Sequence, residues 1–589
     1  MEDSRRILFA IALSLAVLFL WQYLYVIPQQ RENQRLLEIQ QAAQEAQQEA
    51  RGENSQNADT ISITAPPVSP TNSVPTLRDR EEILADAPAG RINIENEKIS
   101  GSISLKGARF NDLNLTDYRQ TQEEGAPAVP LLSPSGSKSM YFAETGWLTA
   151  DKSLPVPKKD TLWKSTSSEL SPTSPVTLTW DNGKGLLFTR TIAIDEHYLF
   201  TVTETVTNSG DRAATLSPYG LINRTRPDSM LMFISHEGPI GVFNNRLEEE
   251  SYDSIQDDQT TLYKGVNGWL GIADKYWLTA FIPDNSLTFD GKFAWYEKND
   301  VHRYQTDYRA VPQTIQAGSS ISLTHHFFAG AKEVHTLDYY ADELKFPLFD
   351  RAIDLGWLYL ITKPIYLLLL WLEELLGNFG LAILAMTVII KALLFPLANK
   401  GYKSMARIRE LAPYMKELKE RYGEDRTRLN SEMMKLYKEK KINPMAGCLP
   451  ILVQIPIFFA LYKVLFVTIE MRLAPFYGWI HDLSAPDPTN IFNLFGLIDW
   501  APPAVLPAIG ILPILFGLSM YFQQKMSPAP LEGMQLTIIR TMPIVFTILF
   551  AGLPAGLVLY WTWNGILSIA QQYVINKNVH REMQREKRK

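Results

Sequence analysis

A single lysine stands inside an apolar segment of this chain. Lys391 lies in the run from Phe379 to Ala398, which is long enough to cross a bilayer as a helix. A charge at such a depth costs roughly 2.5–3.5 kcal/mol, and chains keep one where it lines a water-filled cavity. The alternative is that the side chain extends to the nearer membrane face. At about 1.5 Å per residue, however, Lys391 is about 12 Å from Asn399, where the basic flank begins, and this distance favours the cavity.

Polar side chains recur in the other apolar segments. Gln454 and Gln523 stand in the same halves of their segments as Lys391, toward the basic loops, and Thr387 precedes Lys391 by one helical turn. An inward-opening cavity would collect these groups, so we predict that Thr387, Gln454 and Gln523 line it together with Lys391. Three further polar residues are better explained as small residues that pack helices against one another, namely Ser519, Asn564 and Ser568.

The sequence argues against most other chemistry. No carboxylate lies in the middle of the C-terminal apolar segments, whereas a proton- or sodium-coupled transporter usually needs one. No nucleophile–base pair, H-E-x-x-H motif or Gly-rich phosphate loop is present. The single cysteine, Cys448, excludes an intrachain disulfide, and His325 and His326 alternate faces of a strand-like run. We therefore predict no enzymatic activity, no metal site and no cofactor. A purely structural assembly scaffold stays open as an alternative and predicts that Lys391 is dispensable.

The N-terminal third contains an anchor, a linker and the start of a β domain. An apolar run from Ile7 to Ile27 follows Arg5 and Arg6 and lacks a cleavage site, which predicts an uncleaved membrane anchor with its N-terminus in the cytoplasm. Residues 29–90 are rich in Gln, Glu and Ala and then in Pro, Ser and Thr, as expected of a linker. From Arg91 to Leu344, apolar and polar residues alternate between turn signals. This pattern predicts one large β-sandwich.

The chain then returns to the membrane. Residues 350–376 look like a span but are interrupted by Lys363-Pro364, and topological parity favours a helix lying in the outer interface. The loop 399–445 carries thirteen lysines and arginines against seven acidic residues, which predicts a cytoplasmic position. Its apolar residues recur at helical spacing on both sides of Gly423, and Asp425 is suited to cap a second helix. We predict a helical hairpin there.

Four more crossings complete the prediction, because LPAG at 553–556 divides the last apolar stretch into two short spans. The predicted fold class is an α+β membrane protein with a five-span helical core, an N-terminal anchor helix and a large periplasmic β-sandwich. The predicted segments are the anchor 1–28, linker 29–90, β-sandwich 91–345, interfacial helix 346–376, span 377–398, cytoplasmic hairpin 399–445, span 446–469, periplasmic loop 470–503, span 504–524, cytoplasmic loop 525–540, spans 541–553 and 554–575, and basic cytoplasmic tail 576–589.

Several stretches resemble a known family. They are VIIKALLFPL, the run from YMKELKERYGEDR to FFALYKVL, RLAPFYGWIHDLSAPDP, YFQQKMSP and MPIVFTILFAGLPAGLVLYWTWNGILSIAQQ. Together they resemble the membrane insertases of the YidC/Oxa/Alb family, and the whole chain resembles the Gram-negative form, with its extra first span and periplasmic β-sandwich. The family's intramembrane cation, usually arginine, falls on Lys391, which keeps the charge but loses the guanidinium fork. Trp561 stands where relatives often have tyrosine, and the insert FNLFGLIDWAPP is longer than in some relatives.

This resemblance implies an insertase for newly made proteins of the bacterial inner membrane, with both termini cytoplasmic. It implies a hydrophilic groove, open to cytoplasm and lipid, in which the Lys391 charge attracts acidic substrate segments. It also implies apolar faces along which the substrate's own span slides into lipid, here Ile455, Pro456, Val545, Phe546, Tyr560 and Trp561. The implied partners are nascent membrane proteins, the Sec translocon and its accessory subunits, ribosomes and targeting factors, which meet the hairpin and the basic tail, and the lipid bilayer. The β-sandwich, which resembles sugar-binding sandwiches, is expected to be a scaffold.

Overall fold

The computed structural model describes most of the chain from residue 77 onward. The described residues are 77–86, 90–227, 235–298, 301–423, 425–440, 449–498, 500, 508–526 and 534–586. The predicted N-terminal anchor (1–28), most of the predicted linker (29–90) and Cys448 lie outside them. Of the described residues, 410–423 and 425–440 belong to one compact unit and the others to a second.

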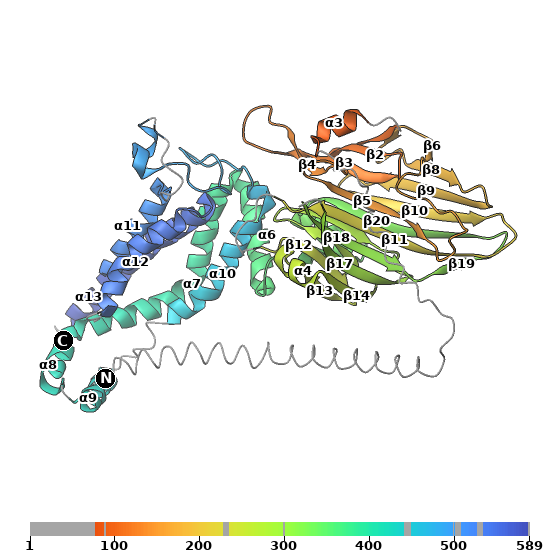
Figure 1. Cartoon of the computed structure of the whole chain (residues 1–589). Helices are drawn as coiled ribbons and strands as arrows, with labels where there is room; N and C mark the ends of the chain where they lie inside the picture. Colours follow the sequence, from red (N-terminus) through yellow and green to blue (C-terminus); the bar gives the residue numbers. More distant parts are fainter. Residues whose placement is uncertain are drawn as a thin grey trace, which may run out of the picture. The chain divides into compact units, whose positions relative to one another are not determined.

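The N-terminal part of the described chain is a β domain of two sheets (Figure 1). The larger sheet has eleven strands in the order β14-β17-β18-β11-β5-β3-β2-β1-β7, with β19 paired to β11 and β4 to β3. Its pairings are antiparallel except that β7 runs parallel to β1. The strands are β1 (Arg91–Glu95), β2 (Ile99–Ser104), β3 (Arg109–Arg119), β4 (Ala128–Leu132), β5 (Tyr141–Leu148), β7 (Glu169–Leu170), β11 (Ala214–Thr225), β14 (Thr260–Val266), β17 (Thr288–Lys298), β18 (Val301–Ala310) and β19 (Gln313–Ile315).

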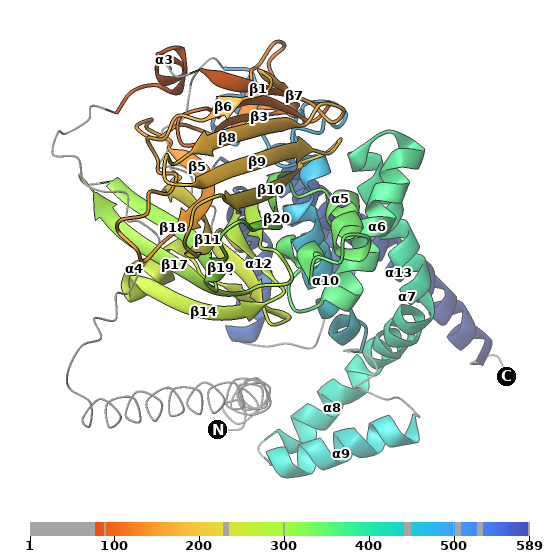
Figure 2. The ribbon, with the colours of Figure 1, turned by 90° about the vertical axis from the view of Figure 1, so that its right-hand side faces the viewer.

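The second sheet has nine strands in the order β13-β12-β15-β16-β20-β10-β9-β8-β6. Figure 2 shows β8, β9, β10 and β20 side by side, as this order requires. The strands are β6 (Lys164–Ser165), β8 (Val176–Asp181), β9 (Leu186–Ile194), β10 (Leu199–Asn208), β12 (Gly238–Phe243), β13 (Arg246–Glu249), β15 (Trp269–Ala273), β16 (Trp277–Ile282) and β20 (Ser320–Ala331).

The two sheets share one apolar core, because buried and exposed positions alternate along strands such as β9 and β10. Phe110 of the larger sheet meets Phe200 and Phe327 of the smaller one, with ring centroids 5.1 Å and 4.8 Å away. The period-2 pattern of the sequence therefore led to the correct architecture, a β-sandwich. Short helices border it, namely α3 (Arg80–Ala85), α4 (Tyr252–Asp258), α5 (Val334–Asp342) and η2 (Phe349–Ala352).

The helical part begins with α6 (Tyr359–Leu376), which has two different sides. Tyr366 and Leu369 are buried, and α6 packs on α10 (Leu449–Val467). Leu360 and Trp371, in contrast, are 88% and 56% exposed. A helix that is apolar on its exposed side suits the membrane interface that the sequence predicts for this segment.

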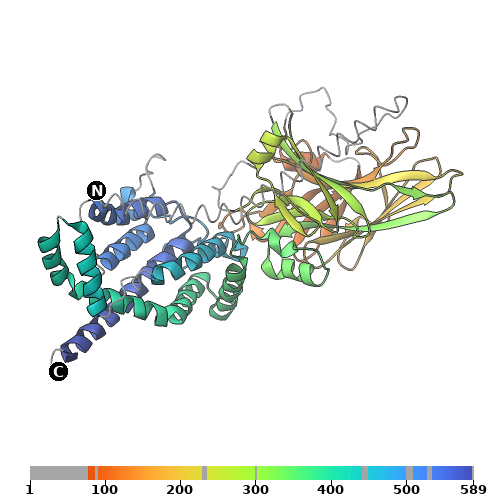
Figure 3. The same ribbon diagram turned by 90° about the horizontal axis from the view of Figure 1, so that it is seen from below.

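In addition to α10 and to two hairpin helices given below, four α-helices follow in the described chain (Figures 1 and 3). They are α7 (Phe379–Glu410), α11 (Ile511–Met526), α12 (Met534–Phe550) and α13 (Ala555–Glu586), and α11 packs against both α12 and α13. Among the described residues, one stretch, Phe379–Ser404 of α7, is both long and apolar enough to cross a membrane; Gln454–Val467 and Thr537–Phe550 are shorter apolar stretches. Figure 3 shows α13 as one continuous helix, which includes most of the tail expected at 576–589.

The hairpin consists of α8 (Ala412–Tyr422) and α9 (Arg426–Glu439). It starts later than the sequence suggested, because α7 continues through Pro396 and Gly401 to Glu410. The Asp425 side chain accepts a hydrogen bond from the Arg428 backbone over 3.0 Å, which confirms it as the cap of α9. Tyr437 is 9% exposed, and its hydroxyl lies 3.6 Å from the Met415 sulfur, so the two helices pair through a narrow apolar seam.

Candidate functional site

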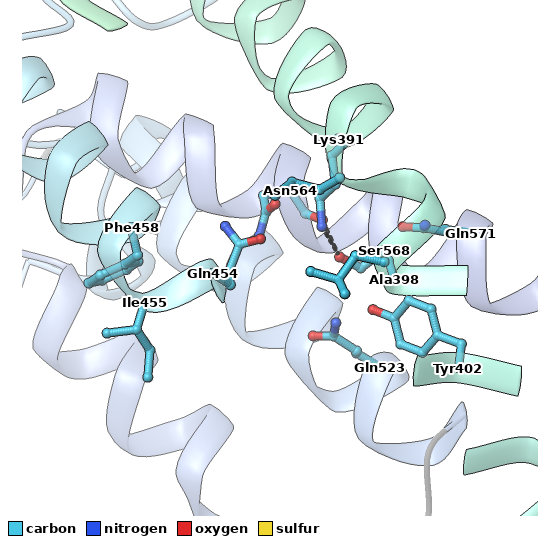
Figure 4. Close-up of a pocket in the computed structure, with 12 residues that line it drawn as sticks. Lys391, Ala398, Tyr402, Gln454, Ile455, Phe458, Gln523, Asn564, Ser568 and Gln571 are labelled. Atoms are coloured by element: carbon cyan, nitrogen blue, oxygen red, sulfur yellow. Dashed lines mark hydrogen bonds between the residues drawn. The ribbon is translucent and has the colours of Figure 1, made fainter. Parts of the chain in front are cut away.

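A cavity of about 280 Å³ lies between α7, α10, α11 and α13. Figure 4 shows its polar side chains converging from these four helices. The lining residues are Lys391, Leu394, Leu397, Ala398 and Tyr402 of α7, Gln454, Ile455 and Phe458 of α10, Gln523 of α11, and Asn564, Ser568 and Gln571 of α13. Three residues expected in a groove, Lys391, Gln454 and Gln523, thus line one cavity.

The half-buried Lys391 side chain crosses from α7 toward α13. Its ammonium donates a hydrogen bond to the Ser568 hydroxyl over 2.7 Å (Figure 4). That hydroxyl is itself buried and donates to the Asn564 carbonyl one turn earlier, also over 2.7 Å. The lysine is therefore directed into the cavity and not along the helix surface, and none of the described lining residues is acidic.

The polar lining of α13 follows helical spacing. Asn564, Ser568 and Gln571 stand four and three residues apart, so they share one face of the helix. The Gln571 amide nitrogen is buried and has no hydrogen-bond partner among the described residues. Such a group is costly to leave unsatisfied, and a cavity of this size and polarity has room for water that would satisfy it. The polar i, i+4, i+7 spacing was visible in the sequence and is the signal by which this face could have been found.

Thr387 has a different environment from the one expected. It is 1% exposed, and its hydroxyl donates to the Ile383 carbonyl over 2.6 Å, one turn earlier in α7. It is not among the residues that line the cavity. A threonine in a helix readily forms this local bond. Thr387 therefore lies one turn before Lys391 in α7, as expected, but its hydroxyl does not reach the cavity.

An aromatic cluster adjoins the cavity. The Phe458 ring, which lines the cavity, stacks on Trp561 at 5.2 Å, and Trp561 stacks on Phe550 at 4.0 Å. Phe516 and Phe546 extend the cluster, at 5.1 Å and 5.2 Å from Phe550. These rings come from α10, α11, α12 and α13, so the cluster packs four helices together next to the polar lining.

The residues expected to form a lipid-side slide divide into two groups. Ile455 and Val545 are 45% and 53% exposed, and their neighbours Phe459 and Ile544 are 50% and 65% exposed. Pro456 and Phe546 are partly buried, whereas Tyr560 and Trp561 are 2% and 5% exposed. The exposed apolar surface is thus on α10 and α12, and Ile455 belongs both to this surface and to the cavity lining.

Small residues allow α11 to approach both α13 and α12 closely. A Cβ atom added at Gly565 would lie 2.5 Å from the Ser519 hydroxyl oxygen, and one added at Gly517 would lie 2.1 Å from that of Thr547. Ser519 is buried and donates to the Phe516 carbonyl. Close contact through small residues is the usual way that helices associate in lipid. In the part of the chain that the structure describes, no group of three or more His, Cys, Asp or Glu residues is arranged for a metal ion.

Comparison with known proteins assigns the chain to a family. Two family models match almost the whole described range, "YidC periplasmic domain" over residues 91–368 and "60Kd inner membrane protein" over residues 371–583. The chain is similar to proteins named membrane protein insertase YidC. It is 47% identical over 571 residues to the one from Rickettsia bellii strain OSU 85-389, and 46% identical over 570 residues to the one from Rickettsia rickettsii strain Sheila Smith. Both alignments cover 96% of this chain and 98% of the relative.

Solved structures include more distant similarities. A crystal structure of an active YidC insertase with its first transmembrane domain resolved matches at a TM-score of 0.34 and 18% identity, over 82% of this chain and 91% of that one. A galactose mutarotase related enzyme from Lactobacillus acidophilus matches at a TM-score of 0.29 and 11% identity, over 41% of this chain and 97% of that one. The two family models and the long alignments at 46–47% identity carry the assignment: the chain belongs to the YidC family of membrane protein insertases.

Proposed function

We propose that this chain inserts newly made proteins into the bacterial inner membrane through the cavity around Lys391. Its family consists of inner-membrane insertases, which move polypeptide segments and are not enzymes. The observation that carries the proposal is the position of Ile455. One residue borders both a polar, positively charged cavity and an exposed apolar helix surface.

The physical task is to move a polar segment through hydrocarbon. Its backbone amides have no hydrogen-bond partners in lipid, and each unsatisfied group costs several kcal/mol. A cavity lined by amides, hydroxyls and one ammonium offers such partners over part of the path. Short apolar helices such as Thr537–Phe550 would also thin the bilayer locally and shorten the remaining distance.

Lys391 would act by charge. At an effective dielectric constant near 20, an acidic side chain about 4 Å away is attracted by about 4 kcal/mol, and water in an open groove lowers this figure. The effect is therefore partial and largest for substrates with acidic translocated segments. The substrate's apolar span would leave along Ile455 and Val545. The buried Tyr560 and Trp561 would not contact it but would pack beneath the helices that form this surface.

The proposed topology has six spans and both termini in the cytoplasm. The anchor 1–28 and helices α7, α10, α11, α12 and α13 would cross the membrane, with α6 in the outer interface and the β domain in the periplasm. The basic residues of 399–445 and of the tail support a cytoplasmic position for both. Ribosomes, targeting factors and the Sec translocon would meet these two regions, and the β domain would serve as a scaffold.

Site-specific photocrosslinking tests the proposal. A photoreactive residue at position 454 or 545 should crosslink to a stalled nascent membrane protein, whereas one at Leu323, which is buried in the β domain, should not. A cysteine at position 391 in a Cys448→Ser background should react with a water-soluble thiol reagent from the cytoplasmic side. Absence of both crosslinks, together with an unreactive cysteine, would refute the groove mechanism.

A further inference from the structure

The segment 491–500, between the expected third and fourth spans, presents a row of exposed apolar side chains. It contains the 3-10 turn η5 (Ile491–Gly496) and lies beside the start of α11 (Figure 1). Each of its seven large apolar residues is at least 39% exposed; they are Ile491, Phe492, Leu494, Phe495, Leu497, Ile498 and Trp500. Soluble surfaces rarely keep so many in one short segment.

Four backbone N–H groups of this segment are bonded to Asn490 and Asn493. The side chain of Asn490 accepts from the Phe492 N–H over 3.1 Å, and that of Asn493 accepts from the Gly496 N–H over 3.0 Å. The backbone carbonyls of the same two asparagines accept from Phe495 and Ile498 over 2.8 Å and 3.1 Å. A loop can enter a region with little water when its backbone polar groups already have hydrogen-bond partners within the protein.

The turn also holds two bulky residues in an unfavourable conformation. Leu494 and Phe495 have φ values of +49° and +61°, in the left-handed region that favours glycine. Both side chains are nevertheless exposed, at 51% and 40%, so packing inside the described chain does not compensate for the strain. Strained positions of this kind are typical of sites that bind something.

The segment is fixed to the first turn of α11. The Ile491 N–H donates to the Ile509 carbonyl over 2.9 Å. The buried Asp487 accepts from the Leu512 N–H over 2.8 Å, and the Thr489 hydroxyl accepts from the Ile511 N–H over 2.9 Å. These bonds hold the exposed apolar segment next to the start of α11, a helix that itself exposes Leu515, Leu518 and Phe522, at 42%, 47% and 51%.

We propose that residues 491–500 are a membrane anchor that lies in the outer lipid interface and fixes the depth of α11. The proposal rests on the topology above, in which this loop is periplasmic. Lipid is the occupant that fits, because the segment is attached to α11, which exposes apolar side chains of its own, and because Asp499 is the only charged residue between Asp487 and Lys525. Without lysine or arginine, the segment binds through apolar insertion of its rings and leucines and not through anionic headgroups.

Fluorescence quenching of the full chain in vesicles tests this anchor. In a Cys448→Ser background, a single cysteine at Leu497, which is 86% exposed, carries an environment-sensitive fluorophore. The matched control carries it at Glu124, in an exposed β-domain loop. The vesicles are phosphatidylcholine with or without phosphatidylglycerol, and quenching is measured with aqueous iodide on both sides and with lipids that bear a nitroxide near the headgroup or at the bilayer centre.

The label at Leu497 should lose iodide quenching relative to Glu124 and should be quenched more by the shallow than by the deep nitroxide, at either phosphatidylglycerol content. A label at Ile498 should behave in the same way. Iodide quenching equal to that of Glu124 would overturn the anchor, and so would protection from both quenchers with Leu497–Leu497 crosslinking, which would identify a second copy as the occupant. An insertion assay on the same labelled chains separates this outcome from failure of the proposed function.

Discussion

The Lys391 ammonium on α7 donates a hydrogen bond to the Ser568 hydroxyl on α13 over 2.7 Å. This bond joins two helices that are far apart in the sequence, across a cavity in which no described lining residue carries a negative charge. The ammonium is thus held by a neutral acceptor, and none of the described lining residues compensates its charge. Under the proposed function, this charge would attract acidic segments of a substrate.

Changing each partner separately distinguishes the charge from the hydrogen bond. Ser568→Ala should lower insertion only slightly, since losing a neutral acceptor that water can replace costs about 1 kcal/mol or less. Lys391→Met keeps the length of the side chain but removes its charge, and should impair substrates with acidic translocated segments much more than neutral ones. Lys391→Arg should be tolerated. Insertion assays on paired substrates measure these effects, and equal insertion of both substrates by Lys391→Met would show that the charge is unnecessary.

The contact between Gly565 and Ser519 gives a prediction about stability. Gly565→Val should force α13 away from α11, because even its Cβ atom would lie 2.5 Å from the Ser519 hydroxyl oxygen. Overpacking of this kind costs about 1–3 kcal/mol, so the thermal unfolding temperature of the purified chain should fall. Gly552→Val is the control, because a Cβ at Gly552 meets nothing within 4 Å. In addition, Ser519→Gly should partly restore the stability of Gly565→Ala; no restoration would argue that another contact is responsible.

The ion pairs of Lys363 indicate which residues next to the β-sandwich a deletion should keep. This lysine of α6 contacts Asp338 of α5 at 2.7 Å and Asp350 at 3.2 Å, and the aspartates raise its pKa above the ordinary value against the effect of burial. We predict that a deletion within the β domain that keeps residues 334–376 retains insertion, whereas one that keeps only 346–376 loses part of it. Lys363→Met in the full chain should reproduce part of that loss, at a cost of about 1–3 kcal/mol. Equal activity of both deletions, at equal protein levels, would show that α5 is not needed.

Local patterns were sufficient to predict the classes of structure. The alternation of apolar and polar residues predicted the sheets, the apolar runs predicted the helices that follow α6, and Asp425 was predicted to cap α9. Each of these signals acts over a few residues. The approach of Gln454 and Gln523 to Lys391 could be inferred because all three stand in the halves of their apolar segments that face the basic loops.

The rotation of each helix about its own axis and the ion pairs between distant residues could not be predicted in this way. The position of a residue along an apolar segment does not decide which face of α13 turns to the cavity, so Asn564 and Ser568 were interpreted as packing residues although they line it. For the same reason Thr387 was expected in the cavity, whereas its hydroxyl bonds to the Ile383 carbonyl of its own helix. The pair between Lys463 of α10 and Asp354, at 2.7 Å, joins residues more than one hundred positions apart and leaves no local signal.

The hairpin α8–α9 should matter beyond setting topology. Its seam includes Met415, Leu418 and Tyr437, and a loop that only carried positive charge would need no such pairing. Replacing residues 411–440 with a flexible loop of equal charge should keep the topology but impair insertion. Tyr437→Ala, which opens the seam and keeps every charge, should weaken insertion in the same direction. Full activity of the flexible-loop chain, measured with the same substrates, would show that the folded hairpin is unnecessary.

The acid stability of the β domain should depend on His325. This residue is 5% exposed, lies against Phe281, and its Nε2 has no partner among the described residues. Burial, with the nearby positive charge of Arg190, lowers the pKa of His325 to about 3. An unfolded histidine titrates near 6.5, so above that pH residue 325 is neutral in both the folded and the unfolded chain. As the pH falls from about 6.5 to about 3, only the unfolded chain takes up this proton, and the free energy of unfolding decreases by up to about 1.4 kcal/mol per pH unit.

His325→Leu should remove this contribution. We expect stability near that of the unsubstituted chain at pH 7, and greater protection at pH 4.5. Hydrogen–deuterium exchange of peptides from β10 and β20 measures the difference, and comparison of variants at the same pH cancels the intrinsic effect of pH on exchange. His335→Gln, at an exposed position of α5, is the control and should leave the pH dependence unchanged. If His325→Leu and the unsubstituted chain lose protection equally between pH 7 and pH 4.5, other buried groups control acid unfolding; His236 is the next candidate, because burial lowers its pKa to about 4.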